Sequence, residues 1–533
     1  MTVSFNLIEE KWIPCLGKNQ DYLLLNIREV ISQAHNLTGL AADLPIMNSA
    51  LFLFLLAFTS AAHPLTDLED WGRLYQNGKF PEAATQDYLI RWHDRFDLFD
   101  QHHPFYQDPK FGIREKDLLN LKNGQKPIPK NIKGLLMHLS SGSNATLFDH
   151  SMDAEEKWYS PGEVAQILVL IQPYSLGGMT SASIGKDKYY KDSPFSRGVT
   201  FCCRGANLFE SLLLNMVPAE QDVISRGRDN RPCWEKDDPF INSSGVPEGL
   251  LDLLTLQSRR VLLIPESISG HVMVKDCFSA PGLHVIETFA NPYYLNSFVV
   301  EKGVTTFKPL RFRTNGVIWR DSTVILDKKP MFSNPPVTRM LFEALNDFFR
   351  NEGVIQSDKI RLDLYGMVTE PGKKIAYDYV HERFDAPAIY LEDPDLHLRL
   401  KEALNLAESV RASLYFATST LASYKIYPDQ DVNEGMSPDK KLVAALYDHI
   451  NMEQRYWGTL ETHFYQLLNQ LPHDGNAMED WKSILKIVAS DCLTAAAEMT
   501  GEDTSSLKAR AKAEMQLGYK LREAFNPEQK ESK

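Results

Sequence analysis

One uninterrupted apolar pattern near the C-terminus constrains the fold of this 533-residue chain more than any other feature. Between residues 396 and 421 the apolar positions recur at alternating spacings of four and three residues. They are Leu396, Leu400, Ala403, Ala407, Val410, Leu414, Ala417 and Leu421. This period is that of a long α-helix whose apolar seam packs on other helices at a shallow angle. The segment therefore predicts a helical bundle.

Three further helical segments are predicted to complete this bundle. They cover residues 437–471, 478–499 and 507–525. The first of them begins at Ser437 with Pro438 at its first helical position, where proline is favoured. Because polar loops separate the segments, an antiparallel four-helix bundle over residues 396–526 is the simplest arrangement, with a polar tail at 527–533.

The remaining part, residues 1–385, has a mixed and irregular pattern. The predicted helices are 41–62, 160–170 and 208–216, and the predicted strands are 260–264 and 316–326. The fold class is therefore α+β: a large irregular mixed N-terminal domain, joined through residues 385–395 to the C-terminal four-helix bundle. The most apolar stretch, residues 46–62, falls short of the ~20 apolar residues of a membrane span, so we expect a buried core helix and no membrane partner.

A β-hairpin is predicted around residue 370. Residues 360–365 and 375–379 alternate apolar or aromatic side chains with polar ones, which is the period of half-buried strands. The tip between them, residues 369–374, contains turn-forming residues and ends in two lysines. Two interpretations are open: a solvated turn, or a wedge that pushes between DNA strands.

Charge and cysteine content narrow the functional classes. Lys and Arg total 57 against 70 Asp and Glu, a net charge of −13. Such a chain does not bind DNA broadly through its overall charge, although a local basic groove is compatible with it. The six cysteines show no CxxC spacing, which argues against a zinc site or disulfides and favours reduced, buried thiols. Residues 1–14 lack a signal-peptide pattern, so we expect a cytoplasmic protein.

No pattern of residues indicates catalysis. The segment from Gly178 to Asp187 resembles a phosphate-binding loop, but six residues separate its glycines where that motif needs four. Asp187 also replaces the Ser or Thr that would hold magnesium. Patterns such as HExxH, HxH and GxSxG are absent from the sequence. We therefore predict no catalytic residue, no metal site and no cofactor, and a protein that is not an enzyme.

Several basic residues lie in loop-like segments or among aromatic residues, as they do in nucleic-acid grooves. Phosphate contacts are predicted for Lys126, Lys130, Lys186, Lys188, Arg311 and Arg313. The alternative for each of them is an ordinary solvated surface position, because charged residues are mostly exposed in any protein.

Four short segments resemble one known family. Residues 5–14, FNLIEEKWIP, resemble the NL…WIP start of the CasA large subunit, and residues 96–107, which end in HHPFYQ, resemble its F…HPFMQ segment. Residues 201–216 are similar to its FVRG…LLLN stretch, and residues 461–472 to its RHFYR…LIP segment. The matches keep their order over most of the chain. The chain therefore resembles the CasA family, the large subunit of the type I-E CRISPR Cascade surveillance complex.

The resemblance implies a non-catalytic subunit of an RNA-guided interference complex. Guide pairing reads the target, while such a subunit recognises the protospacer-adjacent motif in double-stranded DNA and helps open the duplex for R-loop formation. The implied partners are the CRISPR guide RNA, the other Cascade subunits, double-stranded target DNA and a recruited helicase-nuclease.

The resemblance also assigns site residues. The family's glycine loop falls on Gly177 and Gly178, and its lysine finger falls on Lys275. The loop that contacts the complex or its guide falls on Asn144 and Phe148. The wedge falls on the hairpin tip, at Thr369, Glu370, Pro371, Gly372 and Lys373. Family members carry a glutamine in this wedge, and its absence here implies that the preferred motif can differ.

Two alternatives stay open beside this interpretation: a stand-alone metal-dependent nuclease and a purely structural scaffold subunit. Salt-dependent DNA binding would separate recognition from a scaffold, and metal-dependent cleavage would reveal a nuclease.

Overall fold

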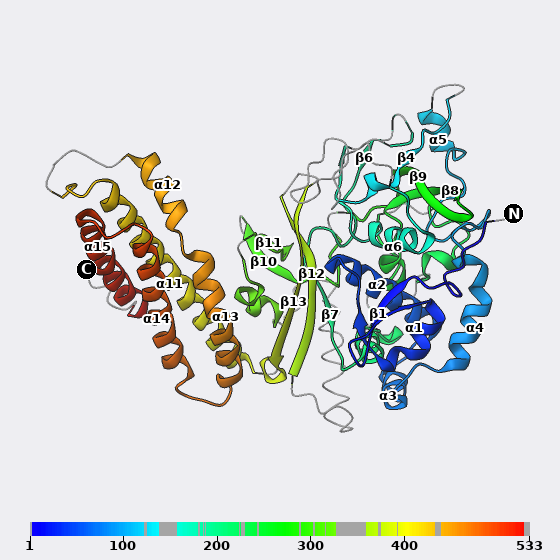
Figure 1. Ribbon diagram of the computed structural model, residues 1–533. Coiled ribbons are helices and arrows are strands. Elements are labelled where there is room, and N and C mark those ends of the chain that lie inside the picture. Colours follow the sequence, from blue (N-terminus) through cyan, green and yellow to red (C-terminus); the bar gives the residue numbers. More distant parts are fainter. Residues whose placement is uncertain are drawn as a thin grey trace. The chain divides into compact units, whose positions relative to one another are not determined.

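The computed structural model of the protein divides the chain into two compact units (Figure 1). Unit 1 contains residues 1–314, 329–356 and 361–384, and unit 2 contains residues 315–328, 357–360 and 385–533. The structure describes residues 3–121, 125–137, 157–179, 182–184, 186, 188–222, 224, 230–241, 245–286, 289–301, 304–314, 316–326, 359–370, 375–391, 393–431 and 439–526.

The core of unit 1 is built around α2 (Pro45–Ala62), most of whose side chains are buried. The rings of Trp12, Phe105 and Trp234 surround Phe54 with centroid distances of 5.7 Å. Among the described helices α2 is long and apolar enough to cross a membrane, but 78% of it is buried inside the protein. It is therefore the buried core helix that its sequence predicts. Unit 1 also contains α1 (Ile27–Gln33), α3 (Leu68–Asn77), α4 (Glu82–Trp92), α5 (Glu115–Asn120), α6 (Pro161–Ile171), α7 (Leu208–Leu213) and α8 (Leu250–Leu254).

The start of α6 follows directly from its sequence. Ser160 is the N-cap residue, and its hydroxyl accepts a hydrogen bond from the main-chain N–H of Glu163. The carboxylate of Glu163 in turn accepts one from the main-chain N–H of Ser160 at 2.8 Å. This reciprocal cap, with Pro161 at the first helical position, confirms the predicted helix start.

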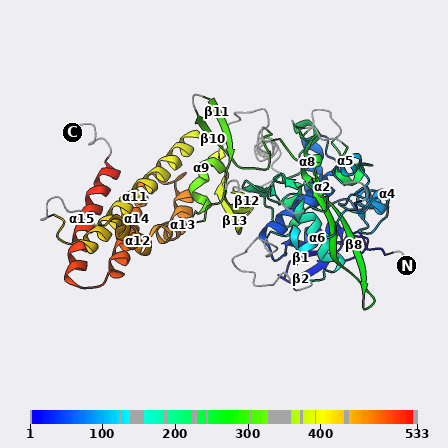
Figure 2. The ribbon, with the colours of Figure 1, turned by 90° about the horizontal axis from the view of Figure 1, so that it is seen from above.

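The strands of unit 1 form small sheets that carry the loops described below. The strand order is β2-β1-β3 in one sheet, β4-β9-β8 in a second and β13-β12-β7 in a third, and β5-β6 and β10-β11 form separate pairs. Figure 2 shows the turn end of the β8–β9 ribbon standing out from the body of unit 1. The strands are β1 (Ile13–Gly17), β2 (Tyr22–Leu25), β3 (Leu37–Leu40), β4 (Lys130–Asn131), β5 (Gly178–Met179), β6 (Tyr189–Tyr190), β7 (Thr200–Cys203), β8 (Arg259–Ile268), β9 (His271–Pro281), β10 (Asn296–Glu301), β11 (Val304–Pro309), β12 (Lys359–Thr369) and β13 (Ala376–Pro387).

Two predictions about strands are confirmed. Residues 260–264 lie within β8, and residues 360–365 lie within β12, which pairs with β13. The other edge of β12 pairs with β7, so the hairpin is part of a sheet of unit 1. Residues 371–374 at the hairpin tip lie outside the described residues.

The predicted strand at 316–326 is wrong. Residues 318–321 form a 3-10 helix, and α9 (Ser322–Ile325) follows it. Ile318, Ser322 and Ile325 are all buried, and their spacing of four and three residues places them on one helical face. The segment belongs to unit 2, where the ring of Trp319 stacks on that of Phe464 with a centroid distance of 4.5 Å.

Unit 2 is organised by α11 (Pro394–Ile426), which buries all eight residues of the predicted apolar seam. It contacts each of the following helices in turn. The predicted single helix at 437–471 is wrong, because Asn451 is extended and its side chain accepts a hydrogen bond from Glu453 N at 2.9 Å, which starts a new helix. The helices after α11 are α12 (Lys440–Ile450), α13 (Glu453–Gln470), α14 (Ala477–Glu498) and α15 (Thr504–Phe525).

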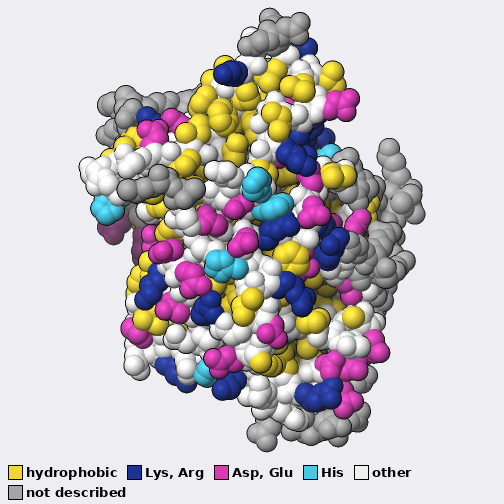
Figure 3. All heavy atoms as spheres, turned by 90° about the vertical axis from the view of Figure 1, so that its right-hand side faces the viewer, with side chains coloured by type: hydrophobic (Ala, Val, Ile, Leu, Met, Phe, Trp, Pro, Cys, Tyr) yellow, Lys and Arg dark blue, Asp and Glu magenta, His cyan; other side chains and the backbone are white. Residues whose placement is uncertain are grey.

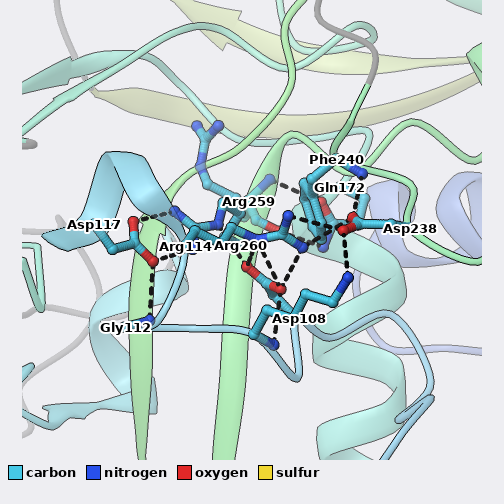
Figure 4. Close-up of polar contacts among 10 residues, drawn as sticks. Asp108, Gly112, Arg114, Asp117, Gln172, Asp238, Phe240, Arg259 and Arg260 are labelled. Atoms are coloured by element: carbon cyan, nitrogen blue, oxygen red, sulfur yellow. Dashed lines mark hydrogen bonds and ion pairs between the residues drawn. The ribbon is translucent and has the colours of Figure 1, made fainter.

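A buried ionic cluster fixes the irregular segment that precedes α5 to the strand β8 (Figure 4). The guanidinium of Arg260 is fully buried and donates to Asp108 at 2.7 Å and to Asp117 at 2.6 and 2.8 Å. Arg114 donates to both oxygens of Asp108 and, at 2.9 and 3.0 Å, to Asp238. Buried charges are tolerated only when they are paired and hydrogen-bonded, as they are here.

We expect Asp238→Asn to lower the free energy of unfolding near neutral pH and to flatten its pH dependence in acid. Burial alone would raise the pKa of Asp238, but hydrogen bonds from Arg114 and Lys110 outweigh it and lower the pKa to about 2. The ionised carboxylate therefore stabilises the fold above its unfolded pKa of about 3.9, and this contribution is lost as the pH falls through about 2. Urea unfolding at several pH values, followed by circular dichroism, measures the effect.

Asp237→Asn is the matched control, because the side chain of this neighbouring residue is 96% exposed. Its effect should stay within about 0.5 kcal/mol, as is usual for surface positions. Equal acid sensitivity of the wild type and Asp238→Asn would contradict the assignment.

Candidate functional site

The segment from Leu176 to Met179, called the glycine loop below, requires glycine on steric grounds. A Cβ atom on Gly177 would lie 2.8 Å from Tyr190 O and from Asp192 N, both main-chain atoms that cannot rotate away. Gly178 has a φ of 139°, which L side chains rarely adopt. The backbone of this loop therefore packs directly on the main chain of residues 190–192, and a side chain at Gly177 would force the two segments apart.

A short two-stranded ladder presents this loop at the surface. Gly178 pairs with Tyr190 and Met179 pairs with Tyr189 in the β5–β6 ladder. The side chains of Met179 and Tyr189 are exposed, at 78% and 61%. The main chain of Gly178, which has no side chain, thus lies beside two exposed side chains that can make apolar contacts.

A buried positive charge lies behind the glycine loop. Arg259 is 5% exposed, and its guanidinium donates to Leu176 O at 3.2 Å and to Ser258 O at 2.9 Å. It also lies 5.1 Å from the ring centroid of Tyr190. Burial lowers the pKa of Arg259 to about 10, so the side chain stays charged near neutral pH. The charge supports the loop through the main-chain carbonyl of Leu176.

Hydrogen bonds join the glycine loop to the β12–β13 hairpin. The main-chain N–H of Gly177 donates to Asp192 Oδ1 at 2.6 Å, and Arg197 Nε donates to Asp192 Oδ2 at 3.0 Å. Arg197 Nη1 donates to the main-chain carbonyl of Glu370 at 3.1 Å. Glu370 follows the last residue of β12, so a continuous series of hydrogen bonds joins the glycine loop to the start of the predicted wedge.

Lys275 lies at an irregularity of the β8–β9 ladder. Ile264 pairs with Asp276 but Pro265 pairs with Val274, which leaves Lys275 as the extra residue of a β-bulge. Bulges turn a side chain away from the regular strand direction and occur next to functional sites. Pro265, which has no N–H to donate to a ladder, is the residue on the partner strand where the register shifts.

The side chain of Lys275 is held by an aromatic ring. Its Nζ lies 5.0 Å from the ring centroid of Trp158, a cation–π distance, and the side chain is 21% exposed. The neighbouring Tyr159 forms an antiparallel bridge with Val274, which places the segment before α6 against β9. The strand β9 also packs against β6, the partner of the glycine loop.

The other predicted residues divide into two groups. Pro371, Gly372, Lys373, Asn144 and Phe148 lie outside the described residues. The side chains of Lys126, Lys186, Lys188, Arg311 and Arg313 are exposed, and Lys130 in β4 is partly buried. Phosphate contacts by these six cations stay predictions.

Charges are interspersed on the face of the protein shown in Figure 3. Lys and Arg side chains alternate with Asp and Glu side chains over its middle, and hydrophobic side chains gather near its upper end. Of the residues that the structure describes, no group of three or more His, Cys, Asp or Glu could hold a metal ion. All six cysteines are free and buried, as the sequence predicted.

Sequence reasoning missed the residues that position this site. Asp192, Arg259 and Trp158 carried no motif, and neither did Arg197, which binds Asp192 and Glu370. These partners are separated by up to 173 residues in sequence. The family resemblance assigned the two glycines, whereas no pattern in the sequence marks the residues that form hydrogen bonds around them.

Comparisons with known proteins agree over nearly the whole chain. The family model described as CRISPR-associated protein Cse1 matches residues 6–492. A CRISPR-associated protein CasA/Cse1 from Thermus thermophilus is 27% identical over 530 residues, which cover 97% of each chain. A crystal structure of CasA from Thermus thermophilus has a TM-score of 0.76 at 24% identity and covers 98% of this chain and 100% of its own.

Two further structures resemble this one in fold. The Cse1 structure from Acidimicrobium ferrooxidans has a TM-score of 0.76 at 24% identity, covering 98% of this chain and 99% of its own. A chain of a CRISPR RNA-guided surveillance complex has a TM-score of 0.72 at 19% identity, covering 96% of this chain and 99% of its own. At these identities the likeness concerns the fold.

We expect Gly177→Ala to destabilise unit 1 by about 1–3 kcal/mol, the usual cost of an atom forced into packed surroundings. The reason is the 2.8 Å approach of the added Cβ atom to two main-chain atoms. Gly39→Ala in β3 is the control, because its Cβ atom would meet nothing within 4 Å. Urea unfolding of the three proteins provides the measurement, and equal midpoints would show that the loop does not need glycine.

Proposed function

The chain belongs to the Cse1 family of CRISPR-associated proteins, and we propose on this premise that it is the DNA-recognition subunit of an RNA-guided surveillance complex. In this role it is non-catalytic. It recognises the protospacer-adjacent motif in double-stranded DNA, helps open the duplex for R-loop formation and recruits the helicase-nuclease. Guide RNA and the other Cascade subunits are its partners in the cytoplasm.

The glycine loop carries this proposal. Gly178 has no side chain and a φ of 139°, so its main chain can approach a base edge more closely than that of a larger residue, while Gly177 lets the loop pack on the main chain of residues 190–192. The minor groove offers few distinguishing groups, and main-chain contacts there read a set of related motifs rather than one sequence. The buried charge of Arg259 behind the loop favours an approaching phosphate backbone.

Lys275 supplies the second contact in this proposal. A lysine at the extra position of a β-bulge stands out of the strand direction, and stacking on Trp158 limits the positions of its ammonium group. The ammonium is a donor only, so it pairs with the acceptor atoms that every base pair presents in the minor groove.

Membership of the family, rather than a feature of the site, supports the proposed partners of this chain. A relative of the same fold is a chain of a CRISPR RNA-guided surveillance complex, which supports guide RNA and further subunits as partners of this chain. Asn144 and Phe148 stay the proposed contacts to the complex or its guide.

The decisive experiment is binding of target DNA by the reconstituted guide-RNA complex, with and without this subunit, across a library of adjacent sequences. Loss of motif preference and of strand opening without the subunit is the expected result, and the library then supplies the motif. Unchanged binding would favour the scaffold alternative. Metal-dependent cleavage by the isolated chain would favour the nuclease.

We expect Lys275→Met to weaken binding to motif-bearing duplex by about 1–3 kcal/mol, or roughly 5- to 150-fold in Kd, the scale of one specific contact. Methionine keeps an unbranched stem against Trp158 while it removes the charge. Binding to motif-free duplex should change little. The measurement is a titration of both duplexes with the reconstituted complex.

Lys188→Ala is the contrasting variant, because its exposed side chain is a predicted phosphate contact. It should weaken binding to both duplexes alike and lower the salt dependence of binding by the amount expected for about one phosphate contact. The same uniform behaviour from Lys275→Met would mean that Lys275 contacts phosphate and reads no base.

A further inference from the structure

The glycine loop and the β12–β13 hairpin, which the proposed function gives separate tasks, meet at one side chain. We propose that Arg197 is a positioning residue that holds the glycine loop and the turn end of the hairpin in one fixed arrangement, so that motif reading and strand separation are coupled. This inference rests on the proposed function, because it assigns to Arg197 the link between two elements that touch DNA.

Contacts with Tyr294 and with β12 fix the main chain at Arg197 and Gly198. The N–H of Arg197 donates to the hydroxyl of the buried Tyr294 at 3.1 Å, and a Cβ atom on the next residue, Gly198, would lie 2.7 Å from the ring of Tyr294. On the other side Gly366 of β12 would place a Cβ atom 3.1 Å from Gly198 O. The two glycines therefore let β12 pack on the main chain of Gly198 and let the ring of Tyr294 pack against Gly198, directly beside Arg197 in the sequence.

The guanidinium group of Arg197 uses different nitrogens for its two partners. Nε donates to Asp192, whose other oxygen accepts from Gly177 N, and Nη1 donates to the carbonyl of Glu370. The side chain is 15% exposed, so these charge-assisted bonds are partly shielded from water. Because the guanidinium group is planar and rigid, a shift of Asp192 relative to the Glu370 carbonyl breaks one of the two hydrogen bonds.

The chain of contacts continues across the hairpin. The carboxylate of Glu370 accepts a hydrogen bond from the hydroxyl of Tyr377 in β13 at 2.7 Å. Arg197 thus connects the glycine loop to the ends of both hairpin strands, on either side of the tip. Movement of the loop when it meets DNA changes the same hydrogen bonds that hold Glu370 and Tyr377.

The test uses the reconstituted complex with Arg197→Gln and three DNA substrates: motif-bearing duplex, motif-free duplex, and motif-bearing duplex opened in advance by mismatches. Strand opening is followed by the fluorescence of 2-aminopurine placed next to the motif. We expect opening of the motif-bearing duplex to slow by about tenfold, the scale of losing one charge-assisted hydrogen bond. Affinity for the pre-opened duplex should stay within about twofold, because that substrate needs no wedge action.

Two further variants keep the test decisive. Asp192→Asn weakens the same link from the loop side and should give the same defect, and the double variant should be no worse than either single one. Arg383→Gln is the matched control, because Arg383 is an arginine of the same hairpin that pairs with Asp363 at 3.4 Å and is 66% exposed. It should open DNA at the wild-type rate.

Each outcome is informative. Wild-type opening rates in both Arg197→Gln and Asp192→Asn would overturn the inference. An equally large loss of affinity for the pre-opened duplex would also overturn it, because Arg197 would then serve the fold or contact phosphate. If Arg197→Gln lowers the thermal stability and Asp192→Asn does not, the opening rate of Asp192→Asn decides whether the inference holds. Absence of motif preference in the wild-type complex would instead refute the proposed function, a result distinct from failure of the coupling.

Discussion

The pairing of Arg260 with Asp108 and Asp117 is the interaction on which the architecture of unit 1 depends most. Residues 107–114 form no helix or strand, and the carboxylates of Asp108 and of Asp117 in α5 bind this part of the chain to the strand β8 through a fully buried guanidinium. Neighbouring residues of a strand point to opposite faces. Arg260 therefore serves this cluster while Arg259 supports the glycine loop on the other side. Two adjacent arginines of one strand thus organise two irregular regions that hydrophobic packing alone would not define.

The candidate site is built from main chain more than from side chains. Gly177 and Gly178 supply a close approach, Asp192 accepts from the loop, and Arg197 carries the link to Glu370. Such a site contains no nucleophile, no paired acid and base, and no ligand set among the residues that take part in it. The role proposed for it is recognition, in which geometry and hydrogen-bond direction decide what fits. This agrees with membership of a family whose fold the chain shares over nearly its whole length.

The sequence predicted features that depend on local pattern and failed where particular contacts, distant or local, override that pattern. The seam of α11, the cap at Ser160 and the paired strands β12 and β13 leave periodic or positional marks, and all three are present. The strand expected at 316–326 is helical because Trp319 packs on residues of α13 some 140 positions later. The break at Asn451 depends on one side-chain hydrogen bond within an otherwise helical pattern. The resemblance to a family located the glycine loop and Lys275, but only the structure revealed the partners that hold them.

The β-bulge at Lys275 has a consequence for how this strand can change during evolution. A regular ladder would form if β9 were one residue shorter at this point, and such a ladder keeps more paired main-chain groups. Val274, Cys277 and Ser279 are buried and pair with alternate residues of β8, so the extra residue is what lets Val274 and Cys277, three positions apart, face the same side. Loss of one residue elsewhere in β9 would exchange its buried and exposed sides, whereas loss of Lys275 itself would keep every cross-strand pair and every face. The bulge is thus a point at which β9 can shorten without turning its buried side outward.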